Sequence, residues 1–221
     1  MPKVTQLKPK ISGSLEATKV VITPPKMATA TVKIVGTAPY VQNRFSSDNR
    51  EKMMETQKAG SAAKKTRKAK APKDFDRVYR GSMHISQDGW HGIPATAIRN
   101  SMIQACRLTE VDMIRAKMCV FVVAQGLDRE DLTPLVKIEG KPRMQIDRVK
   151  IGMGSTDLAA RAVFEKWSAT FDIQWDDDIF KAQDVINLLA RAGYQVGIGA
   201  GRPLSSMSAG TGKGTWKVEE F

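Results

Sequence analysis

The chain has 221 residues, of which 35 are Lys or Arg and 23 are Asp or Glu, so its formal net charge is +12 and its pI is near 9.8. An excess of this size attracts polyanions whatever their sequence, which makes nucleic acid the leading class of partner and an acidic membrane surface the second. No apolar run approaches the roughly 20 residues that a membrane-spanning helix needs, and the N-terminus lacks the apolar core of a signal peptide. We therefore expect a cytoplasmic protein with no membrane partner.

The few potential metal ligands are poorly arranged for binding a metal. Cys106 and Cys119 lie in apolar stretches and are predicted to be buried thiols. His84 and His91 have neither metal-ligand spacing nor a cysteine close by in sequence, and the adjacent carboxylates of residues 176–178 point in different directions on a turn. The sequence predicts no metal and no cofactor.

The N-terminal part of the chain contains an arm, a strand and a basic insertion. Residues 1–28 are punctuated by Lys and Pro and form either an arm that reaches a neighbouring subunit or a partly ordered tail. Residues 30–35 alternate as a first core strand. Residues 46–80 are predicted to be an inserted loop that stays mobile until phosphates neutralise it; a solvated loop without a specific role is the alternative. The candidate nucleic-acid contacts here are Arg44, Lys64, Lys65, Arg67, Lys68 and Lys70.

The middle of the chain is predicted to run strand, helix, strand. Residues 77–86 favour a strand, and Trp90 either stacks on a base or covers the edge of the core. Residues 96–108 favour a helix on which Arg99 either contacts nucleic acid or is an ordinary surface arginine. Its inward face is predicted to carry Ile98, Met102, Ala105 and Cys106. The apolar run at residues 117–124 predicts a central strand.

Residues 126–166 are predicted to be a second insertion. Residues 134–152 favour a hairpin that turns at residues 139–140, with a loop after it. Such a hairpin either wedges an apolar tip between bases while its arginines hold phosphates, or merely covers one face of a sheet. The candidate contacts are Arg143, Arg148, Lys150 and Met153.

The last part of the chain combines a strand, a helix and a glycine-dense loop. Residues 168–175 alternate as a half-buried strand, and residues 185–192 carry apolar side chains at helical spacing, with Gly193 in the position of a left-handed cap before a short strand at 194–198. The loop that follows would let the backbone lie close to a phosphate chain. Its candidate contacts are Gly197, Gly199, Gly201, Arg202 and Lys213.

The loop matches neither of two familiar phosphate-binding motifs. A dinucleotide fingerprint needs glycines that open a helix, whereas here the helix precedes them and the sixth position is Arg202. A P-loop needs Gly-Lys-Ser/Thr before a helix, but Lys213 is followed by glycine and an alternating strand.

Three stretches resemble the RAMP superfamily, the RRM-like subunits of CRISPR effector complexes. They are the ending with its G-x-G-x-x-R pattern at 197–202, the first-helix motif at 92–107, and residues 143–152 with the strand 167–175, which look like a thumb hairpin and third core strand. The resemblance spans residues 29–221, although the usual Gly-Ser pair before the first helix is Ala95-Thr96 here and the chain is short for a backbone subunit. It implies one α+β domain with a ferredoxin-like, split βαβ core and two insertions.

The resemblance also implies a function. The leading hypothesis is a non-catalytic subunit that binds single-stranded RNA, tiles along it with further copies of itself, and contacts other effector-complex subunits. One alternative is a viral or plasmid single-stranded DNA-binding or annealing protein. The other is a RAMP endoribonuclease, which would have to use His84, His91, Asp48, Asp74 or Asp76.

Overall fold

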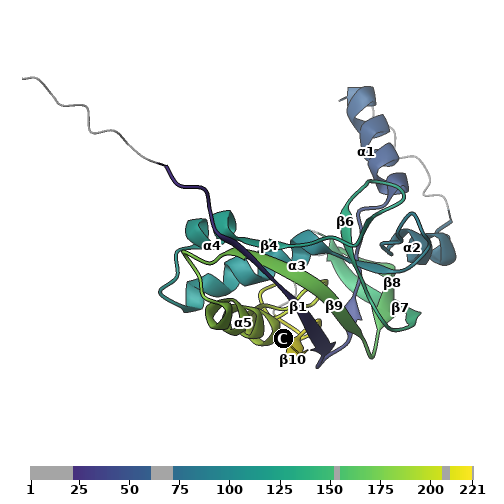
Figure 1. Cartoon of the computed structure of the whole chain (residues 1–221). Helices are drawn as coiled ribbons and strands as arrows, with labels where there is room; N and C mark the ends of the chain where they lie inside the picture. The colour runs from purple at the N-terminus through teal and green to yellow at the C-terminus, as the bar shows by residue number, and fades with distance from the viewer. Residues whose placement is uncertain (1–21, 61–71, 152–154, 206–209, 221) are drawn as a thin grey trace, which may run out of the picture.

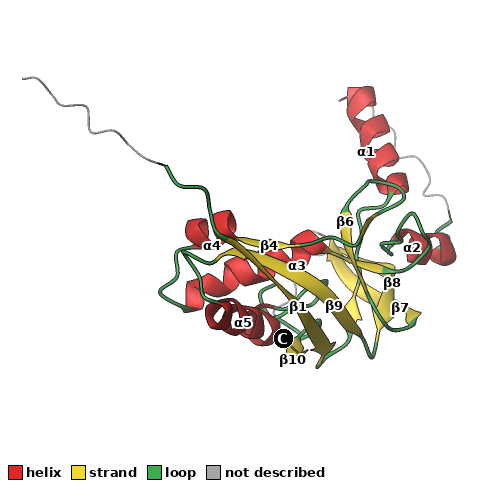
Figure 2. Ribbon diagram, in the orientation of Figure 1, coloured by secondary structure: helices red, strands yellow, loops and turns green. Residues whose placement is uncertain are grey.

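The computed structural model describes residues 22–60, 72–151, 155–205 and 210–220, and it has mixed α+β structure as the sequence predicts (Figures 1 and 2). The elements are β1 (Met27–Gly36), β2 (Tyr40–Val41), α1 (Ser47–Ala59), α2 (Phe75–Gly81), β3 (Gly92–Pro94), α3 (Ala95–Ala105), a 3-10 turn (Cys106–Leu108), α4 (Met113–Cys119), β4 (Val120–Val122), β5 (Gly126–Leu127), β6 (Pro134–Lys137), β7 (Pro142–Ile151), β8 (Ser155–Phe164), β9 (Ser168–Asp176), α5 (Ala182–Arg191), a π-helix (Ala192–Val196) and β10 (Trp216–Glu220).

The main sheet has the strand order β10-β1-β9-β4, and each neighbouring pair is antiparallel. Its two central strands pair continuously from Met27 opposite Asp176 to Val35 opposite Ser168. In the chain, α3 lies between β1 and β4, and α5 lies between β9 and β10. The predicted strands at 30–35 and 168–175 are therefore confirmed, and they are hydrogen-bonded to each other.

One face of this sheet packs against α3 and α5. Alternation along β9 buries every second side chain, and the helix spacing predicted for α3 and α5 buries one stripe of each. Each fully buried Ile, Leu or Phe side chain contributes about 1.5 to 3 kcal/mol relative to exposure. The shared core contains Val32, Ile34, Ile98, Met102, Val120, Ala169, Phe171, Ile173, Trp175, Val185, Leu188, Leu189 and Trp216.

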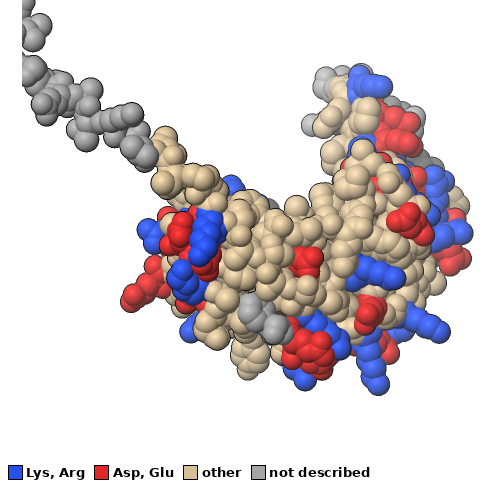
Figure 3. Space-filling view, viewed as in Figure 1, with Lys and Arg blue, Asp and Glu red and all other residues tan. Residues whose placement is uncertain are grey.

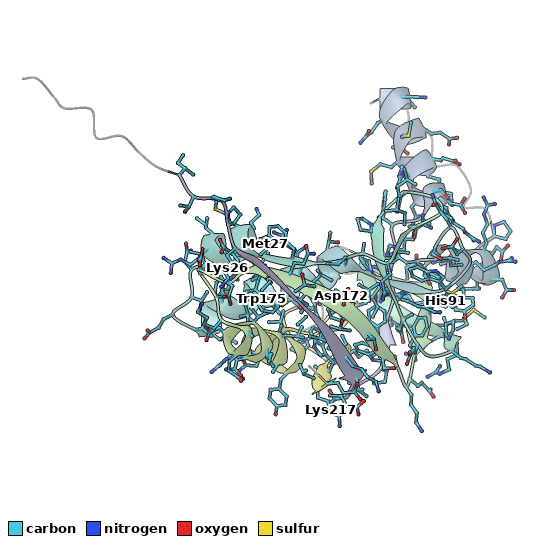
Figure 4. The ribbon with its side chains drawn as sticks, viewed as in Figure 1. Lys26, Met27, His91, Asp172, Trp175 and Lys217 are labelled. Atoms are coloured by element: carbon cyan, nitrogen blue, oxygen red, sulfur yellow. The ribbon has the colours of Figure 1, made fainter. Side chains whose placement is uncertain are left out.

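The opposite face of the sheet is polar. Thr31 donates a hydrogen bond to Asp172 at 2.7 Å, and exposed Thr170 and Gln174 continue the surface along β9. Phe121, 38% exposed, is the one aromatic side chain that the described strands turn to this face. Figure 4 shows Asp172 near the middle of the sheet, and the same view in Figure 3 shows charged side chains gathered mainly toward the two ends. This face thus lacks the row of stacking aromatics that RRM-type proteins use.

The two smaller sheets lie beside the main sheet and have the orders β2-β8-β7 and β3-β6-β5. The long hairpin differs from the prediction. Strand β7 pairs with β8 over ten residues, from Pro142 opposite Phe164 to Ile151 opposite Ser155, so the predicted loop after the hairpin is largely a strand. Residues 152–154, which connect the two strands, lie outside the described part of the chain. The predicted turn at 139–140 is wrong because the backbone of Glu139 bonds to that of Ser168 instead.

The insertion at 46–80 contains two helices, whereas we predicted a loop. Helix α1 projects from the body in Figure 1 and buries no residue, so it lies outside the core. Its first turn is attached by a bidentate pair from Arg77 to Asp48, at 2.5 and 2.7 Å, and by a hydrogen bond from Ser47 to Glu130 at 3.0 Å. Residues 61–71, with five of the basic candidates, lie outside the described part of the chain, as do residues 1–21 of the arm.

Two predicted strands are partly helical because aspartates cap helices there. Asp74 accepts a hydrogen bond from the backbone of Arg77 at 3.0 Å and starts α2, where a strand at 77–86 was predicted. Asp112 accepts from the backbone of Ile114 at 3.1 Å and starts α4, which leaves only Val120–Val122 of the predicted strand at 117–124.

The last helix continues beyond its predicted cap. Gly193 belongs to the π-helix, and the left-handed residue that ends it is Gly197, with φ of +69°. A Cβ at Gly193 would lie 2.5 Å from the carbonyl oxygen of Trp216, so glycine is needed there for close packing and not as a cap. The predicted strand at 194–198 is therefore wrong, whereas the final strand is confirmed as β10.

Candidate functional site

An open groove of about 840 Å³ runs between α3 and the glycine loop at 197–205, and we call it the main groove. One wall is the polar stripe of α3 and its 3-10 extension, where residues spaced four and then three apart share a helix face. These residues are Asn100, Gln104 and Arg107. The other wall consists mainly of backbone and small side chains from Val196 to Ser205.

The glycine loop can form this wall because it has left-handed backbone at positions where a side chain would also collide. Gly199 has φ of +74°, and a Cβ there would lie 2.5 Å from the carbonyl oxygen of Val41. The loop is fixed by backbone hydrogen bonds from Ala200 to Val41 at 2.9 Å and from Gly214 to Pro39 at 2.8 Å. The loop is thus held against β2, with its backbone lining the main groove.

The charge of the main groove is positive. Arg202 uses Nη1 to donate to the carbonyl oxygen of Gly199 at 3.2 Å, and it has no ion pair within the described part of the chain. Arg107 lies on the opposite wall and is exposed, again with no carboxylate partner among the residues described. Two guanidinium groups facing one groove are typical of an anion-binding surface.

A smaller pocket of about 260 Å³ shares Ala97, Gly199 and Arg202 with the main groove, so the two form a continuous surface. It is also lined by Tyr40, Asn43, His84, Pro94 and Ala200. Asn43 accepts a hydrogen bond from Arg161 of β8 at 3.2 Å, which connects this pocket to the base of the long hairpin.

His84 enters the small pocket from the segment after α2 and has a carboxylate partner. Its Nδ1 lies 3.0 Å from Oδ2 of Asp128, and the Asp128 side chain is only 1% exposed. Burial lowers the pKa of His84, although the Asp128 carboxylate opposes that shift. The imidazole is therefore neutral at pH 7.

The structure brings together only part of the predicted site. Gly197, Gly199 and Arg202 line the main groove, and Lys213 packs beside Gly201, where an added Cβ would be 3.2 Å from the Lys213 side chain. Three of the five predicted loop residues, Gly197, Gly199 and Arg202, therefore line the main groove, whereas Gly201 and Lys213 lie beside each other and are not among its lining residues.

Two other predicted nucleic-acid contacts, Arg44 and Arg99, bind groups of the protein itself. Arg44 has a side chain only 3% exposed and lies 3.5 Å from Asp128 and 2.9 Å from Glu130, so its guanidinium faces the interior and not a ligand. Arg99 donates to the carbonyl oxygens of Lys117 and Val120, which ties α3 to the junction of α4 and β4. Its role in the structure is that of a helix tether.

The contacts of Trp90 favour the second of its two predicted roles, in which the indole covers the edge of the core. A Cβ at Gly126 would lie 2.7 Å from the Trp90 ring, and one at Gly92 would lie 3.1 Å from it. The indole therefore covers glycine backbone of the β3-β6-β5 sheet.

The hairpin candidates lie apart from both pockets. Arg143 pairs with Glu165 at 2.5 Å on the surface, and Arg148 is exposed on β7. Lys150 is in β7 opposite Thr156, and Met153 lies outside the described residues, as do the candidates of the basic insertion, Lys64, Lys65, Arg67, Lys68 and Lys70.

Sequence reasoning did not select the polar stripe of α3 or the pair of His84 and Asp128. Asn100, Gln104 and Arg107 lie outside the inward face predicted for this helix, and their common spacing was a usable signal. His84 and Asp128 are 44 residues apart in sequence, so their pairing leaves no local sequence pattern.

The described residues show neither a metal centre nor a membrane span. Across residues 22–60, 72–151, 155–205 and 210–220, no group of three or more His, Cys, Asp or Glu side chains could hold a metal ion. In the same ranges no helix has the length and apolar character needed to cross a bilayer. No protein-family model matches the chain, and no curated protein has a matching sequence.

Proposed function

We propose that the chain is a single-stranded nucleic-acid-binding subunit, with RNA as the preferred ligand, and that the strand lies in the main groove. The observation that carries this proposal is the opposition of Arg202 and the glycine loop to the polar stripe of α3 across about 840 Å³. Arginines and backbone N–H groups hold phosphates, whereas Asn and Gln side chains can bond to base edges. The groove thus offers both kinds of contact from opposite walls.

The strand order supports the fold on which this proposal depends. The two units β1-α3-β4 and β9-α5-β10 interleave in the order β10-β1-β9-β4, which is the order of a ferredoxin-like, split βαβ core. The open face of the sheet is polar, which favours the groove over the sheet as the path of the nucleic-acid strand. We further propose that copies of the chain tile along the strand, with the basic insertion and the hairpin available for contacts to the next copy or to other subunits.

The distribution of charge supports a second contribution from outside the groove. Residues 1–21 and 61–71 together hold eight of the twelve excess positive charges. Such segments strengthen attraction to any phosphate chain without selecting its sequence, so affinity should depend steeply on salt.

The test measures fluorescence anisotropy of a labelled single-stranded RNA with wild type, Arg202→Gln and Arg107→Gln. Each substitution should weaken binding about tenfold or more, because a hydrogen bond to a charged group contributes about 1.5 to 3 kcal/mol. Each should also reduce the slope of log affinity against log salt by about 0.7, the value for one phosphate on a single strand. Arg191→Gln is the matched control, since Arg191 is exposed on α5 and does not line the groove.

Equal affinities for wild type, both groove variants and the control would refute the groove as the binding site. Tighter binding to single-stranded DNA of equal length would replace RNA as the ligand and favour the DNA-binding alternative. Native mass spectrometry with strands of increasing length tests tiling, because the number of copies bound should rise with length.

A further inference from the structure

Strand β7 forms the open edge of the β2-β8-β7 sheet. It pairs with β8 over ten residues without a register shift, and no described strand pairs with its other side. Figure 1 shows this hairpin at one side of the molecule, away from α4 and α5. A long and regular edge with unpaired backbone groups is a template for a further strand, and proteins usually interrupt or cover such an edge.

The hydrogen bonds of β8 show which backbone groups of β7 face the open edge. The carbonyl oxygen of Ala162 accepts from the backbone of Gln42 at 2.9 Å, and its N–H donates to Oγ of Ser82 at 3.0 Å. Both backbone groups of Ala162 therefore point away from β7. Because opposed residues of antiparallel strands alternate between bonded and non-bonded pairs, Met144, which lies opposite Ala162, points its own N–H and C=O to the open edge.

This alternation continues along the strand. Leu158, opposite Arg148, also turns its carbonyl oxygen away from β7, where Nζ of Lys73 donates to it. The backbone groups of Ile146 and Arg148 therefore face outward like those of Met144. These N–H and C=O groups have no hydrogen-bond partner in the part of the chain that the structure describes.

The side chains beside these groups make an apolar patch. Residues two apart share a face of a strand, so Met144 and Ile146 lie side by side, 39% and 49% exposed. Leu158, 46% exposed, lies diagonally across from Ile146 on β8. An exposed apolar patch next to unpaired backbone groups favours a strand as the partner of this edge.

We propose that the β7 edges of two copies of the chain pair antiparallel about a two-fold axis at Ile146, which joins their three-stranded sheets into one. In this register Ile146 lies opposite Ile146 of the second copy, and Met144 lies opposite Arg148 of the second copy. All the outward N–H and C=O groups of these residues are then bonded. The inference is independent of the proposed function, because a two-fold contact closes at two copies without nucleic acid, whereas tiling adds copies along a strand.

The charges of β7 favour a second copy in this register. Asp147 lies opposite Gln145 of the second copy, and these two side chains already bond to each other within one chain, at 2.7 Å from Nε2 to Oδ1. Arg148 lies opposite Met144, and no like charges are directly opposed along β7. A register centred on Asp147 would oppose that carboxylate to itself. One centred on Gln145 would place Arg148 opposite Pro142, which has no N–H to donate.

The first experiment measures the mass of the nuclease-treated full chain by sedimentation velocity at rising concentration. Wild type should shift from 24.3 kDa to twice that mass in the micromolar range, because pairing of one strand edge makes a small interface. Ile146→Asp should weaken the dimer about tenfold or more, since it opposes two carboxylates at the axis. Leu158→Asp is the matched control, because Leu158 is similarly exposed on the same face but lies on β8, away from the open edge.

Amide hydrogen exchange tests the register in wild type, so it does not depend on how a variant folds. The amides of Met144, Ile146 and Arg148 should exchange about tenfold more slowly or less in the dimer than in dilute protein. Those of Gln145 and Asp147 bond to β8 and should be protected at both concentrations. A change at every second residue is specific to pairing through the edge.

Four results overturn the inference. A wild-type mass that stays at 24.3 kDa through the highest soluble concentration shows that the edge remains open. Growth beyond two copies without nucleic acid shows a contact that does not close. A dimer that Ile146→Asp leaves unchanged, or that Leu158→Asp weakens equally, uses another surface. Slowed exchange without the alternation between Ile146 and its neighbours refutes the register. Each of these results leaves RNA binding in the anisotropy assay untouched, so the proposed function stands or fails separately.

Discussion

Gly199 allows the contribution of backbone conformation to be separated from that of close packing. Gly199→Ala places a Cβ at φ of +74°, 2.5 Å from the Val41 carbonyl oxygen and 2.7 Å from the Tyr40 ring. The left-handed backbone costs about 1 to 2 kcal/mol for a residue with a Cβ, and overpacking against buried atoms costs about 1 to 3 kcal/mol more. We expect a loss of about 2 to 5 kcal/mol in the free energy of unfolding.

Gly212→Ala is the matched control for this prediction. Gly212 has φ of +73°, but no heavy atom of the described residues lies within 4 Å of its added Cβ, so the backbone cost of about 1 to 2 kcal/mol applies. Urea unfolding measures both variants, and unchanged m-values show that both midpoints report stability. Equal losses in the two variants would refute the argument that packing against β2 requires glycine in the groove wall.

Three further measurements test other parts of the structure. Arg44→Met should lower the free energy of unfolding by about 3 to 5 kcal/mol, because it removes the guanidinium that faces the buried Asp128 carboxylate and the partly exposed Glu130; a loss under 1 kcal/mol would show that water reaches Asp128. His84→Gln with His91→Gln should flatten the fall in stability between pH 7 and 5, since burial lowers both pKa values below 6.5 and the unfolded chain gains protons first as pH falls. Arg143→Gln should change stability by less than about 1 kcal/mol, because its ion pair is exposed, and a larger change in thermal unfolding would contradict this.

Periodicity identified the elements that form the main sheet and its helices. The alternation of β9 and the helical spacing of α5 each bury the predicted residues, because these elements are long enough for one period to dominate. In shorter segments the pattern of apolar residues does not distinguish a helix from a strand. The apolar residues before Val120 suit a strand equally well, and only the cap from Asp112 decides for a helix.

The candidate site was predictable on its loop side only. The glycine pattern identified Gly199 and Arg202 because close backbone approach requires a specific residue type. The role of an arginine, in contrast, depends on which carboxylates and carbonyl groups the fold places beside it. Arg44 and Arg99 look like surface cations in the sequence, yet Arg44 pairs with the buried Asp128 and Arg99 binds carbonyl groups of α4 and β4.

Helix α1 has a consequence for local unfolding. A 13-residue helix that buries nothing receives no stabilisation from the core, and an isolated helix of this length is marginal in water. Its amide hydrogens should therefore exchange with a protection far below that of β1 and β9, and opening it should leave the rest of the domain folded. Met53 and Met54, 52% and 47% exposed, remain uncovered in the single chain. Slowed exchange across Ser47–Ala59 on addition of a nucleic acid or a second copy would therefore report directly which of them covers this helix.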